Sequence, residues 1–530
     1  MRGFAWLQGQ PWATLCRRVA ALSLLLHVLV AVRSEGFYHC DEHYQVIEFA
    51  ASKAGITPVS ALTWEYGAHI RPWFQPAFYY PLLRGCLALG ISEPFTLALL
   101  LRLVTALLGW SALVAFARTL PHFFPDGSVR RSTLLALHFF HLVPMLSCRT
   151  SSENFAQIFL LFGLTLLIEP GRLGPSLYAS PTVPIPARRL EPAWLLAGIA
   201  FGFSFLARYQ AALFVAGVGL WFLVYGRHKQ RFLLALSGGF LAAVAFGAVL
   251  DRWGYGAWVF PPWDYFRVNL IDGVAAKFSK SPPWGFVALF NAKLMPPFGM
   301  LWLLTLFAAL FALPRHLLTW AVAPFVLGHH ALAHKETRFL FPTLVLALVL
   351  AGLLVQRALD SAERRNYRAP RGVSAAVRGS VVLLFGLNLL GLVTYSLSPT
   401  SPRWTILQGL DALAPAGYTV FTGKGYDAIT RCGSDPRFYW GKRHWQSYAA
   451  SSGLAARDER GLPAFYAWTG NALTVHDNPF HTQCEELFPK FWLSGDQARA
   501  FWSKPLPSSL GKSITTYAVY RCAGGPPASR

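Results

Sequence analysis

The chain has 530 residues, of which 54% are hydrophobic, 15% aromatic and 14% charged, and its formal net charge is +22. Soluble proteins carry about 25% charged residues. This composition therefore excludes a disordered chain, a coiled coil and an ordinary cytosolic enzyme, and it favours a protein that crosses a membrane many times. An excess of Arg and Lys is typical of cytoplasmic loops beside anionic lipid, so we expect membrane lipids as partners and no nucleic acid.

Eleven apolar stretches predict membrane-spanning helices, because each approaches the roughly 20 residues that a span needs. From the amino terminus they are 18–34, 96–117, 132–148, 154–169, 192–207, 210–226, 232–250, 298–313, 317–333, 339–356 and 379–398. The first has an alternative interpretation as a signal peptide, because Arg17 and Arg18 precede a short apolar run. A further stretch, 77–91, is short and flanked by proline, which favours an interfacial or re-entrant segment.

Basic residues fall in alternate connections between these stretches, and the positive-inside rule assigns those connections to the cytoplasm. The basic groups are Arg17 and Arg18, Arg118 to Arg131, Arg172 to Arg189, Arg227 to Arg231, Arg315, and Arg357 to Arg378. The outer side then holds 35–95, 149–153, 251–297, 334–338 and everything after about residue 399. The Pro-rich stretch 170–192 is a predicted cytoplasmic linker.

The sequence predicts two regions: a transmembrane module over 1–398, with the long outer loops 35–95 and 251–297, and an extracytoplasmic C-terminal domain over 399–530. Runs within the second region, such as 418–421 and 516–520, alternate or are rich in strand-forming residues, which favours a small α+β domain. Cys432, Cys484 and Cys522 lie there, and we expect two of them to pair if the region faces an oxidising compartment. The sequence leaves the pairing open.

Carboxylates cluster directly after the first predicted span, where Asp41, Glu42, Gln45 and Glu48 stand close together. In a helix Asp41, Gln45 and Glu48 would share one face. A carboxylate at the edge of the membrane suits a general base, because partial burial and neighbouring charges adjust its pKa. The alternative is a local role, with Asp41 as a helix N-cap and Glu42 as a first-turn acid favoured by the helix dipole.

A second charged cluster, which begins at His334, separates two apolar spans on the predicted outer side. One interpretation is a cationic turn whose side chains snorkel to the interface. A short outer loop should nevertheless contain few basic residues, so Lys335 and Arg338 point to an anionic ligand such as a lipid phosphate. Glu336 can orient either of these two cations.

Other polar residues on the predicted outer side are less distinctive. Arg149 opens a polar turn that suits helix capping, and Arg208 fits either an interfacial anchor or a residue that lines the site. Asp251, Tyr255 and Asn269 mix polar and aromatic groups in one long loop, as an interfacial belt or a sugar-binding surface would.

No metal and no cofactor are expected. His329 and His330 stand near His334 but lack a convincing third ligand. No P-loop, dinucleotide fingerprint, GxSxG or HExxH motif occurs in a supporting context.

Together these residues resemble the Alg9-like family of polytopic mannosyltransferases, which includes the GPI mannosyltransferases and the mannosyltransferases of asparagine-linked glycans. The matching elements are Asp41-Glu42 with Gln45 and Glu48, Thr63-Trp64-Glu65-Tyr66, Ile70-Arg71, Asp251 with Tyr255-Gly256 and Asn269, and His-Lys-Glu-x-Arg-Phe at 334–339. The last signature is intact and is the most specific, and the resemblance covers roughly residues 15–400.

The chain also departs from the family pattern. Cys40 stands where the family usually has proline before the Asp-Glu pair, and Pro72 follows the Ile-Arg pair where serine is common. The aromatic, His-containing stretch of the middle loop is degenerate at 278–284, and the Cys-His-Ser-Thr-Pro element of GPI-type members is not evident. These departures argue against a strict GPI enzyme and leave the acceptor open.

The resemblance implies an all-α polytopic protein of the GT-C type, with about eleven spans, that moves mannose from a polyprenyl (dolichyl-type) phosphate donor to a lipid-linked glycan or glycolipid. Transfer would proceed with inversion at the extracytoplasmic face, without a metal, with Asp41 as the base and Glu42 beside it. The donor phosphate would contact His334, Lys335, Glu336, Arg338 and Arg208. The supporting or acceptor-binding residues would be Gln45, Glu48, Trp64, Glu65, Arg71, Arg149, Asp251, Tyr255 and Asn269.

Other functions remain open at this point: a transporter or flippase of lipid-linked glycans, the same chemistry with another polyprenyl-phosphate sugar, or an inactive scaffold whose tail binds glycan. A transporter more often has inverted repeats and broken helices at the middle of the membrane, whereas the charges here lie at the outer interface. Arg outnumbers Lys, Ala is abundant and no Asn-x-Ser/Thr site occurs. We therefore expect a bacterial inner-membrane protein with a periplasmic site; the alternative is an endoplasmic reticulum protein with a luminal site.

Overall fold

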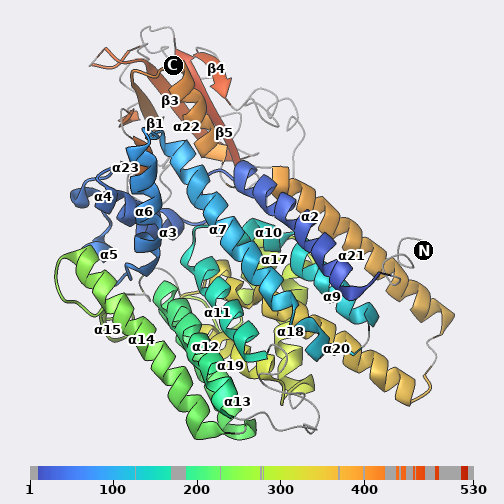
Figure 1. The fold of residues 1–530 in the computed structure, drawn as a ribbon. Helices are drawn as coiled ribbons and strands as arrows, with labels where there is room; N and C mark the ends of the chain where they lie inside the picture. The colour runs from blue at the N-terminus through green and yellow to red at the C-terminus, as the bar shows by residue number, and fades with distance from the viewer. Residues whose placement is uncertain are drawn as a thin grey trace.

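The computed structural model describes residues 10–125, 127–168, 187–226, 228–274, 277, 280–367, 370–397, 400, 402–423, 437–440, 443–448, 457–459, 461–471, 484–488 and 515–522. It is mostly helical, with a sheet at one end (Figure 1). Among these residues, the helices long and apolar enough to cross a membrane are α2 (Trp12–Arg33), α7 (Pro94–Ala117) with α8 (Leu120–Phe123), α14 (Lys229–Tyr255), η6 (Thr337–Thr343) with α20 (Leu344–Arg364), and α21 (Arg371–Leu397). Helices of this length and composition are those of an integral membrane protein.

Shorter apolar helices accompany the long ones: α11 (Ser152–Ile168), α12 (Ala187–Ala207), α13 (Ala212–Tyr225), α18 (Phe298–Ala312) and α19 (Leu317–Ala331). Each predicted apolar stretch overlaps a helix, but 132–148 is divided between α9 (Gly127–Phe139) and α10 (Leu142–Ser147). Pro144 accounts for the division, because it lacks the amide that would donate to the carbonyl of Phe140 in a continuous helix. The count of eleven complete spans stays a prediction.

Short helices fill the two long outer loops. In 35–95 they are α3 (Cys40–Glu42), the π-helix η1 (His43–Ile47), α4 (Glu48–Ala54), η2 (Val59–Ala61), α5 (Trp64–Gly67) and α6 (Phe74–Ala88). In 251–297 they are α15 (Pro261–Phe266), the π-helix η5 (Arg267–Ile271) and α17 (Gly285–Lys293), while η4 (Tyr209–Ala211) follows α12. The short stretch expected at the interface, 77–91, lies mostly in α6, which ends at Ala88 and packs on α4 and α14.

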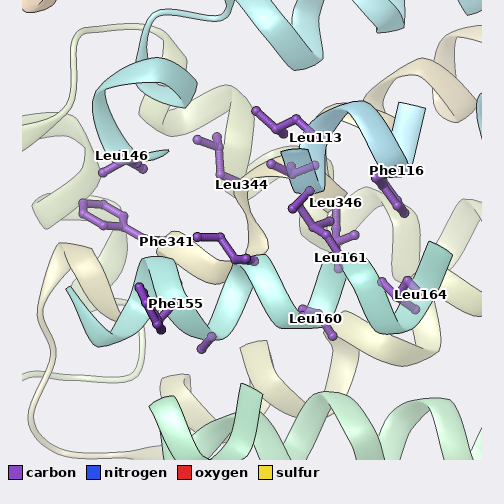
Figure 2. Close-up of a cluster of buried hydrophobic side chains, with 14 of the residues drawn as sticks. Leu113, Phe116, Leu146, Phe155, Leu160, Leu161, Leu164, Phe341, Leu344 and Leu346 are labelled. Carbon is purple, nitrogen blue, oxygen red and sulfur yellow. The ribbon is translucent and has the colours of Figure 1, made fainter. Parts of the chain in front are cut away.

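Apolar side chains from α7, α11 and α20 form the centre of the helical core (Figure 2). Close helix contacts elsewhere depend on glycine, because helices in lipid gain most from tight packing of small residues. On α12 and α14, a Cβ at Gly198 would lie 2.1 Å from the carbonyl oxygen of Leu236, and a Cβ at Gly239 would lie 2.0 Å from that of Leu195. The two helices therefore touch backbone to backbone.

Connections that the charge pattern assigns to the same side meet in space. At the end predicted to be cytoplasmic, Arg131 donates to the carbonyl of Gln10 at 2.9 Å, and the Trp221 indole donates to the carbonyl of Arg315 at 2.8 Å. The predicted outer loops gather at the other end, around the cavity described below. The fold is therefore consistent with the predicted alternation of connections.

Beyond α21 the described chain forms α22 (Pro402–Leu413) and a mixed sheet of five strands in the order β2-β1-β3-β5-β4. The strands are β1 (Tyr418–Gly423), β2 (Arg443–Tyr448), β3 (Ala464–Asn471), β4 (Cys484–Phe488) and β5 (Thr515–Cys522). β1 is parallel to β2 and β3, whereas β5 is antiparallel to β3 and β4. The runs 418–421 and 516–520 lie in β1 and β5 as predicted, and the domain boundary at 399 stays a prediction.

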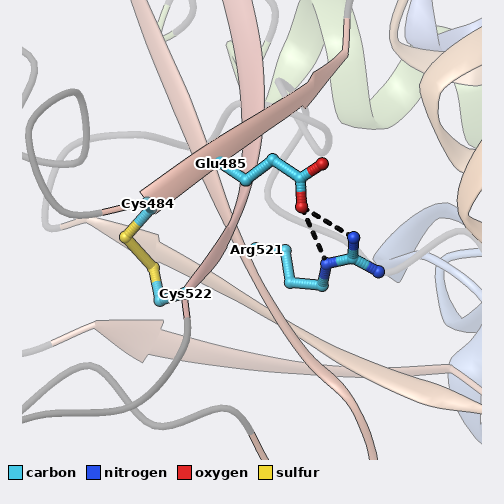
Figure 3. The surroundings of a disulfide bond; sticks show 4 residues. All are labelled: Cys484, Glu485, Arg521 and Cys522. Atoms are coloured by element: carbon cyan, nitrogen blue, oxygen red, sulfur yellow. Dashed lines mark hydrogen bonds and ion pairs between the residues drawn. A yellow bond between two sulfur atoms is a disulfide. The ribbon is translucent and has the colours of Figure 1, made fainter.

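Cys484 and Cys522 form a disulfide between β4 and β5, beside an exposed ion pair of Glu485 and Arg521 at 2.6 Å (Figure 3). This is one of the pairings that the sequence left open. Cys432 lies outside the described residues, as does most of the predicted linker 170–192. One further element of the C-terminal region, α23 (Arg437–Trp440), packs against α4 and α7.

Candidate active site

Segments far apart in the sequence meet at one cavity of about 700 Å³, a volume typical of sites for small molecules. They are the segment after α2, the segment around α5, the turn between α12 and η4, η5, and the connection between α19 and η6. Many residues singled out from the sequence line this cavity: Asp41, Gln45, Trp64, Glu65, Arg71, Arg208, Asn269, His334, Glu336 and Arg338. The two charged clusters, nearly 300 residues apart in the chain, therefore belong to one site.

Asp41 lies in the first turn of α3 and faces the cavity with its side chain 27% exposed. Its Oδ2 accepts a hydrogen bond from Nη2 of Arg338 at 2.7 Å. The N-cap of α3 is His39, whose Nδ1 accepts from the Asp41 amide at 3.3 Å. The alternative in which Asp41 itself caps the helix is therefore wrong, and its carboxylate is available to the cavity.

Arg338 holds several carboxylates with one guanidinium. Besides Asp41, it binds Oε1 of Glu153 at 2.9 Å and Oε2 of Glu336 at 2.6 Å. Arg208 binds the same oxygen of Glu153 at 2.7 Å. Two arginines that line the cavity thus converge on one buried anionic oxygen, which is the geometry a phosphate oxygen would need.

The pKa values of the two acids that line the cavity, Asp41 and Glu336, reflect these cations. Burial alone would raise the pKa of the Asp41 carboxyl, but Arg338, Arg71 and His39 together hold it well below its usual range. The pKa of Glu336 is likewise lowered despite burial, because His334, Arg338 and His39 surround it. Asp41 is therefore ionised at neutral pH, but it is a weak base for as long as these cations stay in place.

Glu42 is buried and braces the site without lining the cavity. It accepts hydrogen bonds from the amides of Thr150 at 3.0 Å and Tyr38 at 3.1 Å. Arg149 lies 3.6 Å from Glu42 and donates to the carbonyls that end α2 and start the next loop, at Ser34 and Gly36. Arg149 is therefore more than a capping residue, because it ties the end of α2 to the segment that carries Asp41.

Glu48 does not share a face with Asp41 and Gln45, so the helical pattern expected from the sequence is wrong at this residue. The segment His43–Ile47 is a π-helix, and the amide of Glu48 donates to the carbonyl of His43, five residues back. This wider turn rotates Glu48 away from the position that a regular α-helix would give it. Glu48 instead pairs with His43 at 2.9 Å in the protein interior.

A polar chain also lines the cavity. Nε2 of Gln45 donates to Glu65 at 3.1 Å, and Glu65 lies 3.5 Å from Arg71. The guanidinium of Arg71 stands 5.7 Å from the ring centre of Tyr265. Trp64, which is 49% exposed, also lines this part of the cavity and could stack on a sugar ring.

Some expected site residues act on the backbone instead. Oδ1 of Asp251 accepts from the Trp73 amide at 2.8 Å, and the Tyr255 hydroxyl donates to the Arg71 carbonyl at 2.8 Å. Both therefore position the chain around Arg71. Nζ of Lys335 donates to the carbonyls of Ser281 and Leu332, and Lys335 is not among the described residues that line the cavity.

The sequence predicted no role in the site for His39, Glu153, Gln210 or Tyr265, although each of them lines the cavity or bonds to a residue that does. Glu153 carried a signal, because a carboxylate at the start of an apolar span is costly unless it is paired. Within the described parts of the chain, no group of three or more His, Cys, Asp or Glu residues could hold a metal ion. Metal independence stays a prediction.

Comparison with known proteins gives a family match. The model of the "Alg9-like mannosyltransferase family" matches residues 19–400. A mannosyltransferase of Arabidopsis thaliana, APTG1, is 25% identical over 345 residues, which cover 63% of this chain and 58% of the relative. The GPI alpha-1,2-mannosyltransferase 3 of Danio rerio is 31% identical over 116 residues, or 21% of this chain and 20% of the relative. The matches thus span about three-fifths of the plant relative and one-fifth of the fish relative.

Solved structures give weaker likenesses. ArnT from Cupriavidus metallidurans in the apo state has 12% identity and a TM-score of 0.47, with 96% of this chain and 97% of that chain covered. The apo oligosaccharyltransferase of Archaeoglobus fulgidus has 11% identity and a TM-score of 0.46, with 88% and 70% covered.

Proposed function

Because the chain belongs to the Alg9-like mannosyltransferase family, we propose that it is a membrane mannosyltransferase that uses a polyprenyl-phosphate-linked donor and a lipid-linked glycan or glycolipid acceptor. One observation carries the proposal: Asp41 and the arginine pair Arg208 and Arg338 line the same cavity. A base and a phosphate-binding group within one cavity are what such a transfer requires. The GT-C type of fold is part of this proposal.

Asp41 is the proposed general base. Its carboxylate takes the proton from the acceptor hydroxyl, whose oxygen forms a bond to C1 of mannose. The bond between C1 and the phosphate oxygen breaks, and the polyprenyl phosphate leaves with the electron pair. A single displacement of this kind inverts the configuration at C1 and needs only one base.

Arg338 and Arg208 are the proposed donor-phosphate ligands, with His334 near them in the cavity. Their guanidiniums would stabilise the charge that develops on the departing phosphate. When a phosphate engages Arg338, the hold of this arginine on Asp41 weakens and the pKa of Asp41 rises. Donor binding would therefore make Asp41 a stronger base, whereas Lys335 would first have to leave its backbone acceptors to take part.

The cavity is proposed to face the extracytoplasmic or luminal side. Among the described residues, the connections at Arg131 and Arg315 lie at the opposite end of the helices, as the positive-inside rule requires of cytoplasmic loops. The C-terminal strands, which follow the last span, carry the disulfide between Cys484 and Cys522, and such bonds persist in oxidising compartments. The periplasm and the lumen of the endoplasmic reticulum both meet this condition, so the bacterial origin stays a prediction.

The test is a transfer assay with the purified protein in lipid, using radiolabelled polyprenyl-phosphate-mannose, crude membrane lipids as acceptor, and EDTA. We expect label in a new lipid product, and we expect Asp41→Asn to remove it while the protein stays folded. Transfer only with another polyprenyl-phosphate sugar would change the donor. Near-normal turnover by Asp41→Asn would reject the assigned base. No transfer with any donor, together with translocation in proteoliposomes, would favour a flippase.

A further inference from the structure

A short helix of the C-terminal region, α23, is packed into the core of the transmembrane module. Phe438 and Tyr439 of α23 are both buried, and they belong to the same apolar cluster as the membrane helices. α23 packs against α4 and α7. The region after the last span is thus anchored in the module that carries Asp41.

The contact falls on the acidic residue that the π-helix turned away from the cavity. Oε1 of Glu48 accepts a hydrogen bond from the Phe438 amide at 2.9 Å and pairs with Nε2 of His43 at the same distance. Its other oxygen accepts from the hydroxyl of Thr57 at 2.8 Å. Glu48 therefore joins α23 to both ends of the π-helix.

Tyr439 makes the second contact. Its ring stacks on the imidazole of His43 with centroids 5.3 Å apart, and it lies 5.1 Å from the ring of Phe95 on α7. Burial raises the pKa of the Tyr439 hydroxyl, and the charges of Arg102 and Glu42 act on it as well. Tyr439 thus packs on the buried side of the segment that carries Asp41, whereas Asp41 itself lines the cavity.

We propose that α23 is a positioning element of the active site. The Phe438 amide binds Glu48 and the Tyr439 ring packs on His43, so α23 contacts the two residues at the ends of the π-helix. These contacts fix the orientation of the Asp41 side chain in the cavity. The proposal rests on the proposed function, because Asp41 must be the base for its position to matter. Phe438 and Tyr439 are positioning residues and do not touch substrate.

A covalent bond also restrains this segment. Cys40, directly before Asp41, is disulfide-bonded. Most family members have proline at this position, as noted above. A covalent restraint on one side of Asp41 and the α23 contact on the other leave the α3 turn little freedom.

The test compares one substitution at two buried tyrosines of the C-terminal region. Tyr439→Leu removes the ring from His43, whereas Tyr466→Leu removes a ring that stacks on Phe421 within the sheet. We expect Tyr439→Leu to lower kcat at least tenfold with little change in the donor KM, and Tyr466→Leu to change neither strongly. Tyr439→Phe keeps the stacked ring and should restore most of kcat.

A second readout does not depend on activity. Hydrogen–deuterium exchange of peptides that cover 39–48 should rise in Tyr439→Leu and stay near the wild-type rate in Tyr466→Leu. If Tyr439→Leu is not recovered folded, Glu48→Gln takes its place, with the same expectations for kcat and exchange.

Unchanged exchange over 39–48, or equal loss of kcat in both Tyr→Leu variants, would overturn the positioning role. If the wild-type protein transfers nothing while Tyr439→Leu still raises exchange there, the proposed function fails and the mechanical coupling stands.

Discussion

Asp41 is the residue on which the proposed chemistry depends, and its environment makes a pH prediction. Arg71 is one of the cations that keep its pKa low. Replacing Arg71 by Gln raises that pKa, so protonation removes the base at a higher pH than in the wild-type protein. We expect the acidic limb of the kcat/KM profile, which reports the free enzyme, to move to higher pH.

Arg71→Lys is the matched control for this prediction, because it keeps the positive charge while changing the shape of the side chain. It should leave the acidic limb near its wild-type position. If both variants shifted the limb equally, the effect would come from geometry and not from charge.

Glu153 makes a prediction about stability. It is buried between Arg208 and Arg338, so Glu153→Ala leaves two guanidiniums short of a partner. Removing one partner from a buried ion pair costs about 3–5 kcal/mol, and we expect a clear fall in the thermal unfolding midpoint in lipid nanodiscs. Glu485→Ala breaks the exposed pair with Arg521 and should cost only about 0–1 kcal/mol. Equal losses in the two variants would contradict the assigned burial.

Single residues also show which parts of the site the sequence predicts and which it does not. The two clusters around Asp41 and Arg338 were predictable, because charges at a membrane edge are rare and each stood in a recognisable pattern. Their direct hydrogen bond was not predictable, since it joins residues far apart in the chain. Glu48 was placed on the wrong face because nothing in the local sequence indicates a π-turn. The packing of Phe438 and Tyr439 on the helices was not predictable, since a short apolar segment in a region of mixed composition has no feature that distinguishes it from other such segments.

At the scale of elements, the close packing of α12 on α14 predicts the effect of single glycine substitutions, which hydropathy does not. α12 leads to Arg208, and the last two turns of α14 carry Asp251 and Tyr255, which the sequence had placed in a loop, so the spacing of the two helices influences the cavity. Gly239→Ala would put a Cβ 2.0 Å from the Leu195 carbonyl oxygen, whereas at Gly238 the nearest atom is a Leu195 methyl at 3.8 Å. Overpacking costs about 1–3 kcal/mol, so we expect Gly239→Ala to lower the unfolding midpoint and the transfer rate.

Gly238→Ala is the neighbouring control and should be tolerated, because its methyl group finds ordinary contact distance. Thermal unfolding and transfer activity, measured side by side, distinguish the two variants. Equal behaviour would mean that the two helices do not approach as closely as their backbones indicate.

At the scale of the whole molecule, charge and cysteine chemistry indicate the same orientation. In the described part of the chain, the connections at Arg131 and Arg315 lie at one end of the helices, and the cavity lies at the other. The charge pattern was readable from the sequence, because the positive-inside rule counts residues and needs no structure. The contact between the tail and the cavity end was not readable, since it depends on how α23 packs.

This orientation predicts which residues an impermeant reagent reaches. Val59, in the loop after α2, and Tyr367, between α20 and α21, are 53% and 60% exposed and lie at opposite ends of the spans. If the cavity faces the periplasm, we expect a membrane-impermeant maleimide to label Val59→Cys in intact cells and Tyr367→Cys only after permeabilisation. If it faces the lumen, neither is labelled in intact cells, and permeabilising the plasma membrane alone exposes only Tyr367→Cys. Of the free native thiols among the described residues, Cys86 and Cys148 are buried and should react little, whereas Cys16 is half-buried, so both variants also carry Cys16→Ser.

Two results would contradict this prediction in different ways, because the direction in which the protein faces and the number of times the chain crosses the membrane are separate properties. Reversed accessibility would keep the fold and the alternation of connections but turn the cavity toward the cytoplasm, where a disulfide in the C-terminal strands would be reduced. Labelling of both cysteines from one side would contradict the threading itself, because an odd number of spans must separate the two positions. Only the expected result agrees with both the arginine pattern and the bond between Cys484 and Cys522.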